Sequence, residues 1–276
     1  MVTDSACSLP AELAQAAGAR VVPMWVHLGS EEHPDGALPT EEVLRRSPEG
    51  VTTSCPSPGQ LLDACEQADD GDGVLVLTIS ARMSGVYEAA VNAARQRAGR
   101  TEVVDTGTAA GAEGLVVLAA CAAARQGRSL DEVSELARSV ARRARLVATV
   151  PSLDHLARSG RVPAIAASGA RRLGLGALFE FRHGRAFPLR PALGRQAALE
   201  RMLAMLARDA DRSGDGPGRL HVAGLHALDR ATAEQLVERV RLRWRPETSF
   251  VGDFSAVMVA HTGPGLVGLA WYWDRA

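Results

Sequence analysis

The fold of this chain is decided by the stretch Val74-Leu75-Val76-Leu77-Thr78-Ile79-Ser80-Ala81-Arg82-Met83-Ser84-Gly85-Val86-Tyr87-Glu88. Its apolar first half, residues 74–80, predicts a buried strand. The polar residues after it predict a tight turn, and the segment from about Val86 predicts a helix. Ser84 and Gly85 then lie at the helix N-terminus, where backbone N–H groups lack partners and the helix dipole favours an anion. Because ligands of open α/β sheets bind at such strand ends, this stretch predicts a site for a carboxylate or phosphate.

Strands and helices alternate on both sides of this stretch. Residues 19–28 are predicted as one strand, and Ser57-Pro58 as the N-cap and first residue of a helix. This alternation favours an α/β fold with a mostly parallel sheet covered by helices over residues 1–150. The elements interleave less regularly afterwards, and the runs 255–260 and 266–271 both have the character of strands. We therefore predict a second, α+β domain over residues 151–276.

The composition is that of an ordinary soluble globular protein. The 276 residues are 46% hydrophobic and 23% charged, enough to bury the core of one large domain or two ordinary ones. The formal net charge of −1 gives no indication of a nucleic-acid partner. All 31 basic residues are arginine, which excludes Schiff-base and P-loop lysine chemistry.

Neither the first residues nor the cysteines suggest export. Residues 1–5 lack the basic and apolar segments of a secretory signal. The longest apolar run, residues 115–124, is too short to span a membrane. The four cysteines lack C-x-x-C spacing, so we expect reduced thiols, no metal site and a cytoplasmic protein; they are Cys7, Cys55, Cys65 and Cys121.

Five polar, mostly glycine-containing segments follow or close the apolar runs. Each taken singly is typical of turns and helix caps. A lone histidine such as His261 is usually structural, and we expect the other histidines, His27 among them, to be structural or solvent-exposed. The five segments are Thr3-Asp4-Ser5, Thr52-Thr53-Ser54, Ser84-Gly85, Ser159-Gly160-Arg161 and His261-Thr262-Gly263-Pro264-Gly265.

Taken in this order, the segments resemble the motifs of the DegV family, which are bacterial fatty-acid-binding proteins. The resemblance covers nearly the whole chain, and several ordered matches are far more specific than any single one. Residues 2–10 are similar to V-T-D-S-x-x-D-L-P, residues 53–58 to T-S-Q-P-S-P, residues 80–90 to S-x-x-x-S-G-T-Y-x-x-A, residues 153–162 to L-x-x-L-x-x-G-G-R-I, and residues 261–265 to H-x-G-P-G.

The resemblance implies a carrier. Members of the family hold one long-chain fatty acid between an N-terminal three-layer α/β/α domain and a C-terminal domain. They present its carboxylate to a separate, ATP-binding fatty acid kinase, which makes an acyl phosphate. By this resemblance the protein has no catalytic residues and no cofactor, and its ligand is the fatty acid. Its contact with membranes is at most transient.

The same resemblance assigns the residues that bind the carboxylate. They are Thr53, Ser84 and His261, with Ser54 and Gly85 as neighbours, and the candidates for a supporting role are Asp4, Ser5, Arg161 and Gly263. Elementary energetics agrees, because a carboxylate in an apolar cavity needs hydrogen-bond donors. The acyl tail needs only an apolar tunnel, in which each buried CH₂ contributes about 0.8 kcal/mol.

The chain departs from the family pattern at several positions. Val86 replaces a threonine, which removes one hydroxyl close to the expected head group, and Cys55 replaces a glutamine. Ser159 replaces the first glycine of G-G-R, and residues 174–180 lack the family's lysine and proline. Arg190 is a candidate match for the arginine that follows the G-x-[IV] hairpin in the family. These changes bear on the identity of the acid and on coupling to the kinase.

Two other functions are compatible with these residues. Ser84 and His261 are a candidate nucleophile and base of an acyl hydrolase, although Met83-Ser84-Gly85 is not G-x-S-x-G and no acidic residue is evidently placed to orient His261. A small-molecule phosphotransfer or sugar-binding subunit is the second alternative. It rests on fold-level analogy, because subunits of dihydroxyacetone kinase and of the mannose transporter share the N-terminal fold. The sequence has no P-loop and no G-x-G-x-x-G motif.

Overall fold

A computed structural model of the chain describes residues 1–46, 50–151, 177–182, 184–211 and 218–274. Within these ranges the first sheet has the strand order β2-β1-β6-β7, and all of its neighbouring strands are parallel. Its strands are β1 (Val2–Asp4), β2 (Arg20–Val22), β6 (Val74–Thr78) and β7 (Thr101–Asp105). The predicted parallel N-terminal sheet is therefore confirmed.

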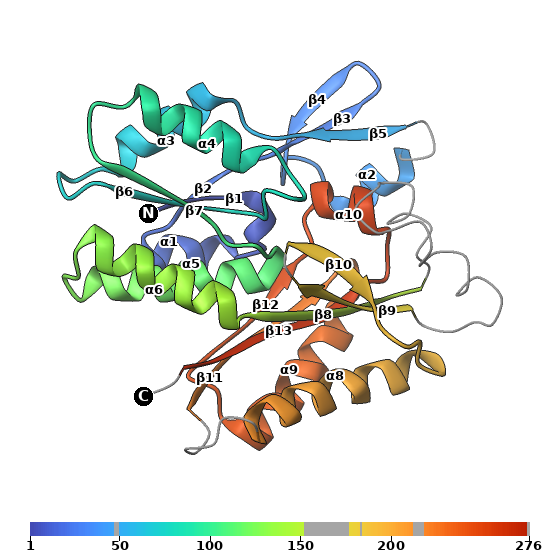
Figure 1. Cartoon of the computed structure of the whole chain (residues 1–276). Helices are drawn as coiled ribbons and strands as arrows, with labels where there is room; N and C mark the ends of the chain where they lie inside the picture. The colour runs from blue at the N-terminus through green and yellow to red at the C-terminus, as the bar shows by residue number, and fades with distance from the viewer. Residues whose placement is uncertain (47–49, 152–176, 183, 212–217, 275–276) are drawn as a thin grey trace.

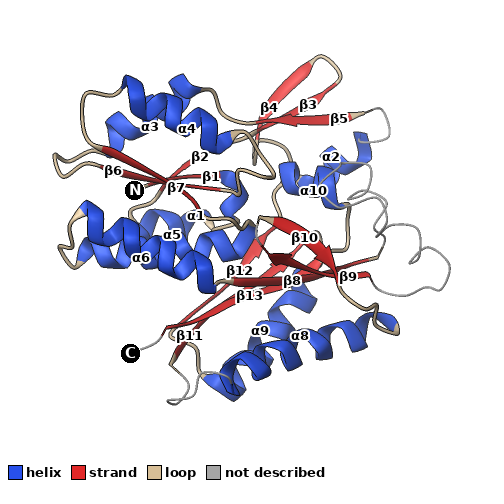
Figure 2. Cartoon of the chain, in the orientation of Figure 1, coloured by secondary structure: helices blue, strands red, loops and turns tan. Residues whose placement is uncertain are grey.

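Helices cover both faces of this sheet, which gives the predicted three layers (Figures 1 and 2). α3 (Pro58–Ala68) and α4 (Val86–Gln96) lie on one face. α1 (Ala11–Ala17), α5 (Ala110–Arg125) and α6 (Leu130–Arg143) lie on the other. Local sequence sets two of the starts, because Ser57 with Gln60 and Ser129 with Glu132 form capping boxes.

The second sheet is mixed and has the strand order β10-β9-β8-β13-β11-β12. One of its faces packs against α8 (Gly194–Asp211) and α9 (Arg230–Trp244), and the other packs against α5 and α6 (Figure 1). α5 and α6 thus lie between the two sheets. The strands are β8 (Arg145–Val150), β9 (Ala177–Arg182), β10 (Arg185–Pro188), β11 (Arg219–His226), β12 (Thr248–Asp253) and β13 (Val267–Asp274).

One buried cluster continues from the first sheet through α5 into the second. It contains Leu77 of β6, Leu115 of α5 and Leu146 of β8. The layers approach so closely that a Cβ atom on Gly111 of α5 would lie 2.7 Å from the Cβ atom of Ala223 in β11. A buried apolar core of this kind fixes the two sheets relative to each other.

A small antiparallel sheet forms an arm beside the first sheet (Figure 1). Its order is β4-β3-β5, from β3 (Trp25–Leu28), β4 (Glu31–Pro34) and β5 (Val51–Ser54). The prediction of one strand over residues 19–28 is wrong, because β2 ends at Val22 and β3 starts at Trp25 in a different sheet. Pro23 lies at the break, and proline has no N–H to donate to a strand ladder.

Two short helices, α2 (Thr40–Arg46) and α10 (Ala256–Thr262), pack against each other next to the arm. The predicted strand over residues 255–260 is therefore wrong. A short apolar run does not distinguish a buried strand from a buried helix, and the first turn of α10 receives support from a distant residue, since the Val257 amide donates to Asp35. In the described part of the chain, no helix is long and apolar enough to cross a membrane.

Candidate functional site

A cavity of about 310 Å³ opens between the arm, α10 and the turn that connects β6 to α4. Phe181 of β9 also lines it, as does Ile79, the residue that follows β6. Most of the wall is apolar, and the polar groups gather where β5 ends and α10 and α4 approach. The lining residues are Met24, Thr53, Ser54, Cys55, Ile79, Met83, Ser84, Gly85, Phe181, Val257, Met258, His261 and Thr262.

The polar end of the cavity contains a hydrogen bond between Thr53 of β5 and His261 of α10. Thr53 Oγ1 lies 2.9 Å from His261 Nε2, although 208 positions separate the two residues. Both side chains are half-buried. If His261 Nε2 carries the proton, the Thr53 hydroxyl remains free to donate to a ligand oxygen; in the other tautomer Thr53 donates to the ring and His261 Nδ1 carries the proton.

Ser84 and Gly85 lie where the sequence predicts them, at the start of α4. Gly85 is the N-cap, and the Ser84 amide donates to the Ser80 carbonyl at 3.2 Å. No side chain caps this helix end, so the first amide groups of α4 remain available as donors. Gly85 also approaches Cys55 closely, because a Cβ atom on Gly85 would lie 3.6 Å from Cys55 Sγ. β5 and α4 therefore meet at the polar end of the cavity.

The loop that follows β1 is connected to the cavity wall through the buried side chain of Asp4. Asp4 is buried at the end of β1 and accepts from the amides of Ala6 at 3.0 Å and Ile79 at 2.9 Å. Burial raises the pKa of the Asp4 carboxyl to about 6, against the lowering effect of these two amides. Since Ile79 is a cavity residue, Asp4 links the loop to the cavity wall without lining the cavity itself.

Asp35, which the sequence analysis missed, connects the loop to α10. Its Oδ2 accepts from Ser5 Oγ at 2.6 Å and its Oδ1 from the Val257 amide at 3.3 Å. Burial raises the pKa of the Asp35 carboxyl, opposed by these donors. At the other end of α10, Gly263 has φ of +76° and its amide donates to Val259. No local sequence pattern indicates that Asp35 caps a helix more than 200 positions away.

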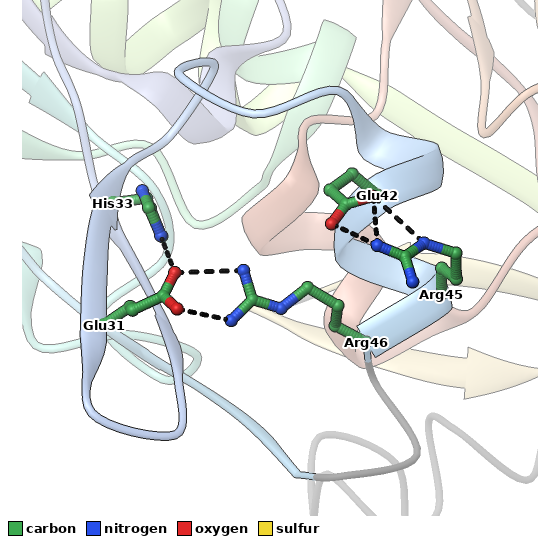
Figure 3. A network of polar contacts seen from close by, with 5 residues as sticks. All are labelled: Glu31, His33, Glu42, Arg45 and Arg46. Atoms are coloured by element: carbon green, nitrogen blue, oxygen red, sulfur yellow. Dashed lines mark hydrogen bonds and ion pairs between the residues drawn. The ribbon is translucent and has the colours of Figure 1, made fainter.

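The arm is tied to α2 by ion pairs on its outer side (Figure 3). Glu31 of β4 accepts from His33 Nε2 and from Arg46 of α2, each at 3.0 Å. Hydrogen bonding from Arg46 is the main reason why the pKa of Glu31 falls to about 2. Because α2 packs against α10, this exposed network connects the arm to the helix pair that contains His261.

Other predicted positions either lie outside the described residues or are absent from the cavity lining. Arg161 and Ser159 lie outside the described residues, as do residues 174–176. Val86 is fully buried in the core and is absent from the cavity lining. The replacement of the family's threonine by Val86 therefore removes no hydroxyl from the described polar end of the cavity. Cys55, by contrast, lines the cavity. Sequence reasoning also missed the apolar lining residues Met24 and Phe181, because apolar residues carry no signal that separates a cavity wall from a core.

The comparison with family models covers residues 1–274, and the matching model is described as an uncharacterised protein of the DegV family. The chain belongs to the DegV family. Among relatives, a DegV domain-containing protein of Streptomyces coelicolor is 36% identical over 98% of this chain and 96% of its own length. A DegV domain-containing protein of Deinococcus radiodurans is 33% identical over the same shares.

Solved DegV structures share the whole fold. A DegV family protein from Thermus thermophilus, whose structure is described as showing fatty acid binding, has a TM-score of 0.88 and 31% identity over 99% of this chain and 98% of its own. A DegV lipid-binding protein from Thermotoga maritima has a TM-score of 0.85 and 25% identity over 100% and 98%. The fold predicted from the DegV resemblance is therefore confirmed.

Proposed function

We propose that this DegV protein binds one long-chain fatty acid in the cavity between the arm, α10 and β9. The Thr53–His261 pair, at the polar end of an otherwise apolar cavity, is the observation that carries the proposal. Thr53, Ser84 and the α4 amides supply neutral donors for the carboxylate, and His261 supplies a donor or a positive charge. The relatives from Thermus and Thermotoga, described as fatty-acid and lipid binding, support the same ligand class.

The protein then acts as a carrier that presents the carboxylate to a separate fatty acid kinase, an ATP-binding partner that forms the acyl phosphate. Two features support presentation at this place. Ser54 and Gly85 are exposed residues of the cavity lining, so the polar end lies near the surface. The apolar wall extends inward to Phe181, which suits an acyl tail. The supporting roles assigned to Asp4, Ser5 and Gly263 are part of the same proposal, as is a domain boundary near residue 150.

The acyl-hydrolase alternative built on Ser84 and His261 receives less support. His261 Nε2 is directed at Thr53, and a hydroxyl in that position does not orient a catalytic base as a carboxylate does. Fold-level analogy remains the only ground for a phosphotransfer-type subunit. A cavity with apolar walls and neutral hydrogen-bond donors suits the binding of a fatty acid, and binding alone requires no catalytic base.

Solvent extraction of the purified protein, followed by mass spectrometry, tests this proposal. We expect one fatty acid per chain, or stoichiometric uptake when a long-chain acid is added. A protein that is empty and also refuses added long-chain acids would contradict the ligand class. Kinase presentation is tested separately, by acyl phosphate formation when a fatty acid kinase and ATP are added.

A further inference from the structure

We propose that Ser54 is an activated serine nucleophile, served by His27 as general base and Glu32 as the residue that positions His27. Ser54 Oγ lies 2.8 Å from His27 Nε2. The other ring nitrogen, His27 Nδ1, lies 3.4 Å from Glu32 Oε1. A hydroxyl, an imidazole and a carboxylate in this order form the arrangement by which serine nucleophiles are recognised on unrelated folds.

Strand register creates this arrangement. His27 of β3 is paired directly with Glu32 of β4 on one side and with Thr52 of β5 on the other. Ser54, two positions after Thr52, projects from the same face of the sheet because side chains alternate along a strand. Thr53, between them, points to the opposite face and to His261. Thr53, the proposed carboxylate-binding residue, and Ser54, the proposed nucleophile, are therefore neighbours in sequence whose side chains lie on opposite faces of the arm.

Ser54 is accessible to a substrate. Ser54 is exposed and is also a lining residue of the cavity, so it lies at the rim. The following residue, Cys55, also lines the cavity beside Gly85, so Ser54 adjoins the cavity wall. An ester whose acyl tail occupies the cavity would place its carbonyl near this rim.

The substrate class is an ester or thioester of a long-chain acid with a solvent-exposed alcohol or thiol. Ser54 Oγ attacks the acyl carbon while His27 Nε2 takes the hydroxyl proton. The bond to the leaving alcohol or thiol breaks, and His27 returns the proton to it. Water, activated by the same histidine, then cleaves the acyl-serine and regenerates Ser54. The product is a free fatty acid, the ligand of the cavity according to the proposed function, on which this substrate class rests.

Labelling with an alkyl fluorophosphonate tests the nucleophile without requiring a bound fatty acid. The serine oxygen forms a bond to phosphorus and fluoride leaves, so peptide mass spectrometry locates the modified residue. We expect the label on Ser54, and a rate about 100-fold or more lower in His27→Asn, because a general base contributes at least that factor. Glu32 is 66% exposed, so Glu32→Gln should lower the rate only several-fold. Thr52→Ala is the matched control and should label normally.

Absence of label on Ser54, or an unchanged rate in both His27→Asn and Glu32→Gln, would overturn the proposal. Circular dichroism verifies that each variant is folded, and Glu32→Gln serves as the test if His27→Asn is not. Hydrolysis of a p-nitrophenyl ester of a long-chain acid should fall in parallel with the labelling. Fatty-acid affinity distinguishes the two proposals, because His27→Asn should bind the acid like the wild type. Labelling with no fatty-acid binding would leave the nucleophile intact and reject the carrier.

Discussion

Asp35 Oδ1 accepts a hydrogen bond from the amide of Val257 at 3.3 Å, across 222 positions of sequence. The same carboxylate accepts from Ser5, whose Oγ in turn accepts from the Met24 amide. The first loop, the arm and α10 therefore meet at one side chain. His261 depends on this junction for its position, because α10 is a short helix with little stability of its own.

Asp35→Ala should destabilise the protein by about 1–3 kcal/mol, because it leaves buried donors without an acceptor. Asp35→Asn is the matched control, since it retains an acceptor for the Val257 amide and should recover most of the loss. Urea unfolding measures both. Equal destabilisation by the two variants would show that charge, and not the cap of α10, is what matters at this position.

Gly111→Ala should also be costly. Its new methyl group would lie 2.7 Å from Ala223 Cβ and 2.9 Å from Leu225 Cδ2, at the contact between α5 and the second sheet. Overpacking of this kind costs about 1–3 kcal/mol. Gly59→Ala is the matched control, because Gly59 is likewise the second residue of its helix and meets no atom closer than 3.8 Å. Thermal unfolding should show a loss for Gly111→Ala and a small gain for Gly59→Ala.

Cys55 should report occupancy of the cavity. It is half-exposed and lines the cavity, whereas the other three cysteines are buried and burial raises their thiol pKa values. Iodoacetamide should therefore modify Cys55 first. A fatty acid at 100 times its dissociation constant leaves about 1% of the protein free, so alkylation of Cys55 should slow roughly tenfold or more. Alkylation at an unchanged rate under saturating acid would place the ligand elsewhere.

The free energy of unfolding should depend on pH because of the raised pKa of Asp4. Burial raises the pKa of its carboxyl from 3.8 to about 6, so between these values the folded state holds a proton that the unfolded chain has released. Asp4 therefore favours folding more at pH 4 than at pH 7, and the difference is lost as pH rises through 6. Two units correspond to about 3 kcal/mol. The difference in unfolding free energy between wild type and Asp4→Asn should fall by about that amount from pH 4 to pH 7; a flat or rising difference would contradict it.

The elements that the sequence predicts correctly are those with local signals. α3 begins at Pro58 after the Ser57 cap, and α4 begins at Val86 after a buried strand, as predicted. The predictions that are wrong concern segments whose secondary structure depends on contacts with residues far away in the sequence. Pro23 divides one apolar run between two sheets, and the 255–260 run becomes a helix beside α2 with Asp35 at its start.

The candidate site divides in the same way. Ordered motifs pointed to Thr53, Ser84 and His261, which the fold brings to one cavity. Nothing in the sequence indicated the role of Asp35 or the alignment of His27 with Ser54, because both depend on the register and placement of the arm. The pairing partner and register of short antiparallel strands are hard to predict from sequence when apolar residues do not alternate strongly along them.

Thr53 and His261 are proposed to bind the carboxylate of a long-chain fatty acid. Calorimetric titration of the Thr53→Val, His261→Ala double variant with a fatty acid and with the alcohol of the same chain length tests it most directly. Each hydrogen bond to the charged carboxylate contributes about 1.5–3 kcal/mol, so affinity for the acid should fall at least about tenfold while affinity for the alcohol changes little. Thr52→Val on the same strand should bind both ligands like the wild type. Equal losses for acid and alcohol, or no loss for the acid, would contradict the account.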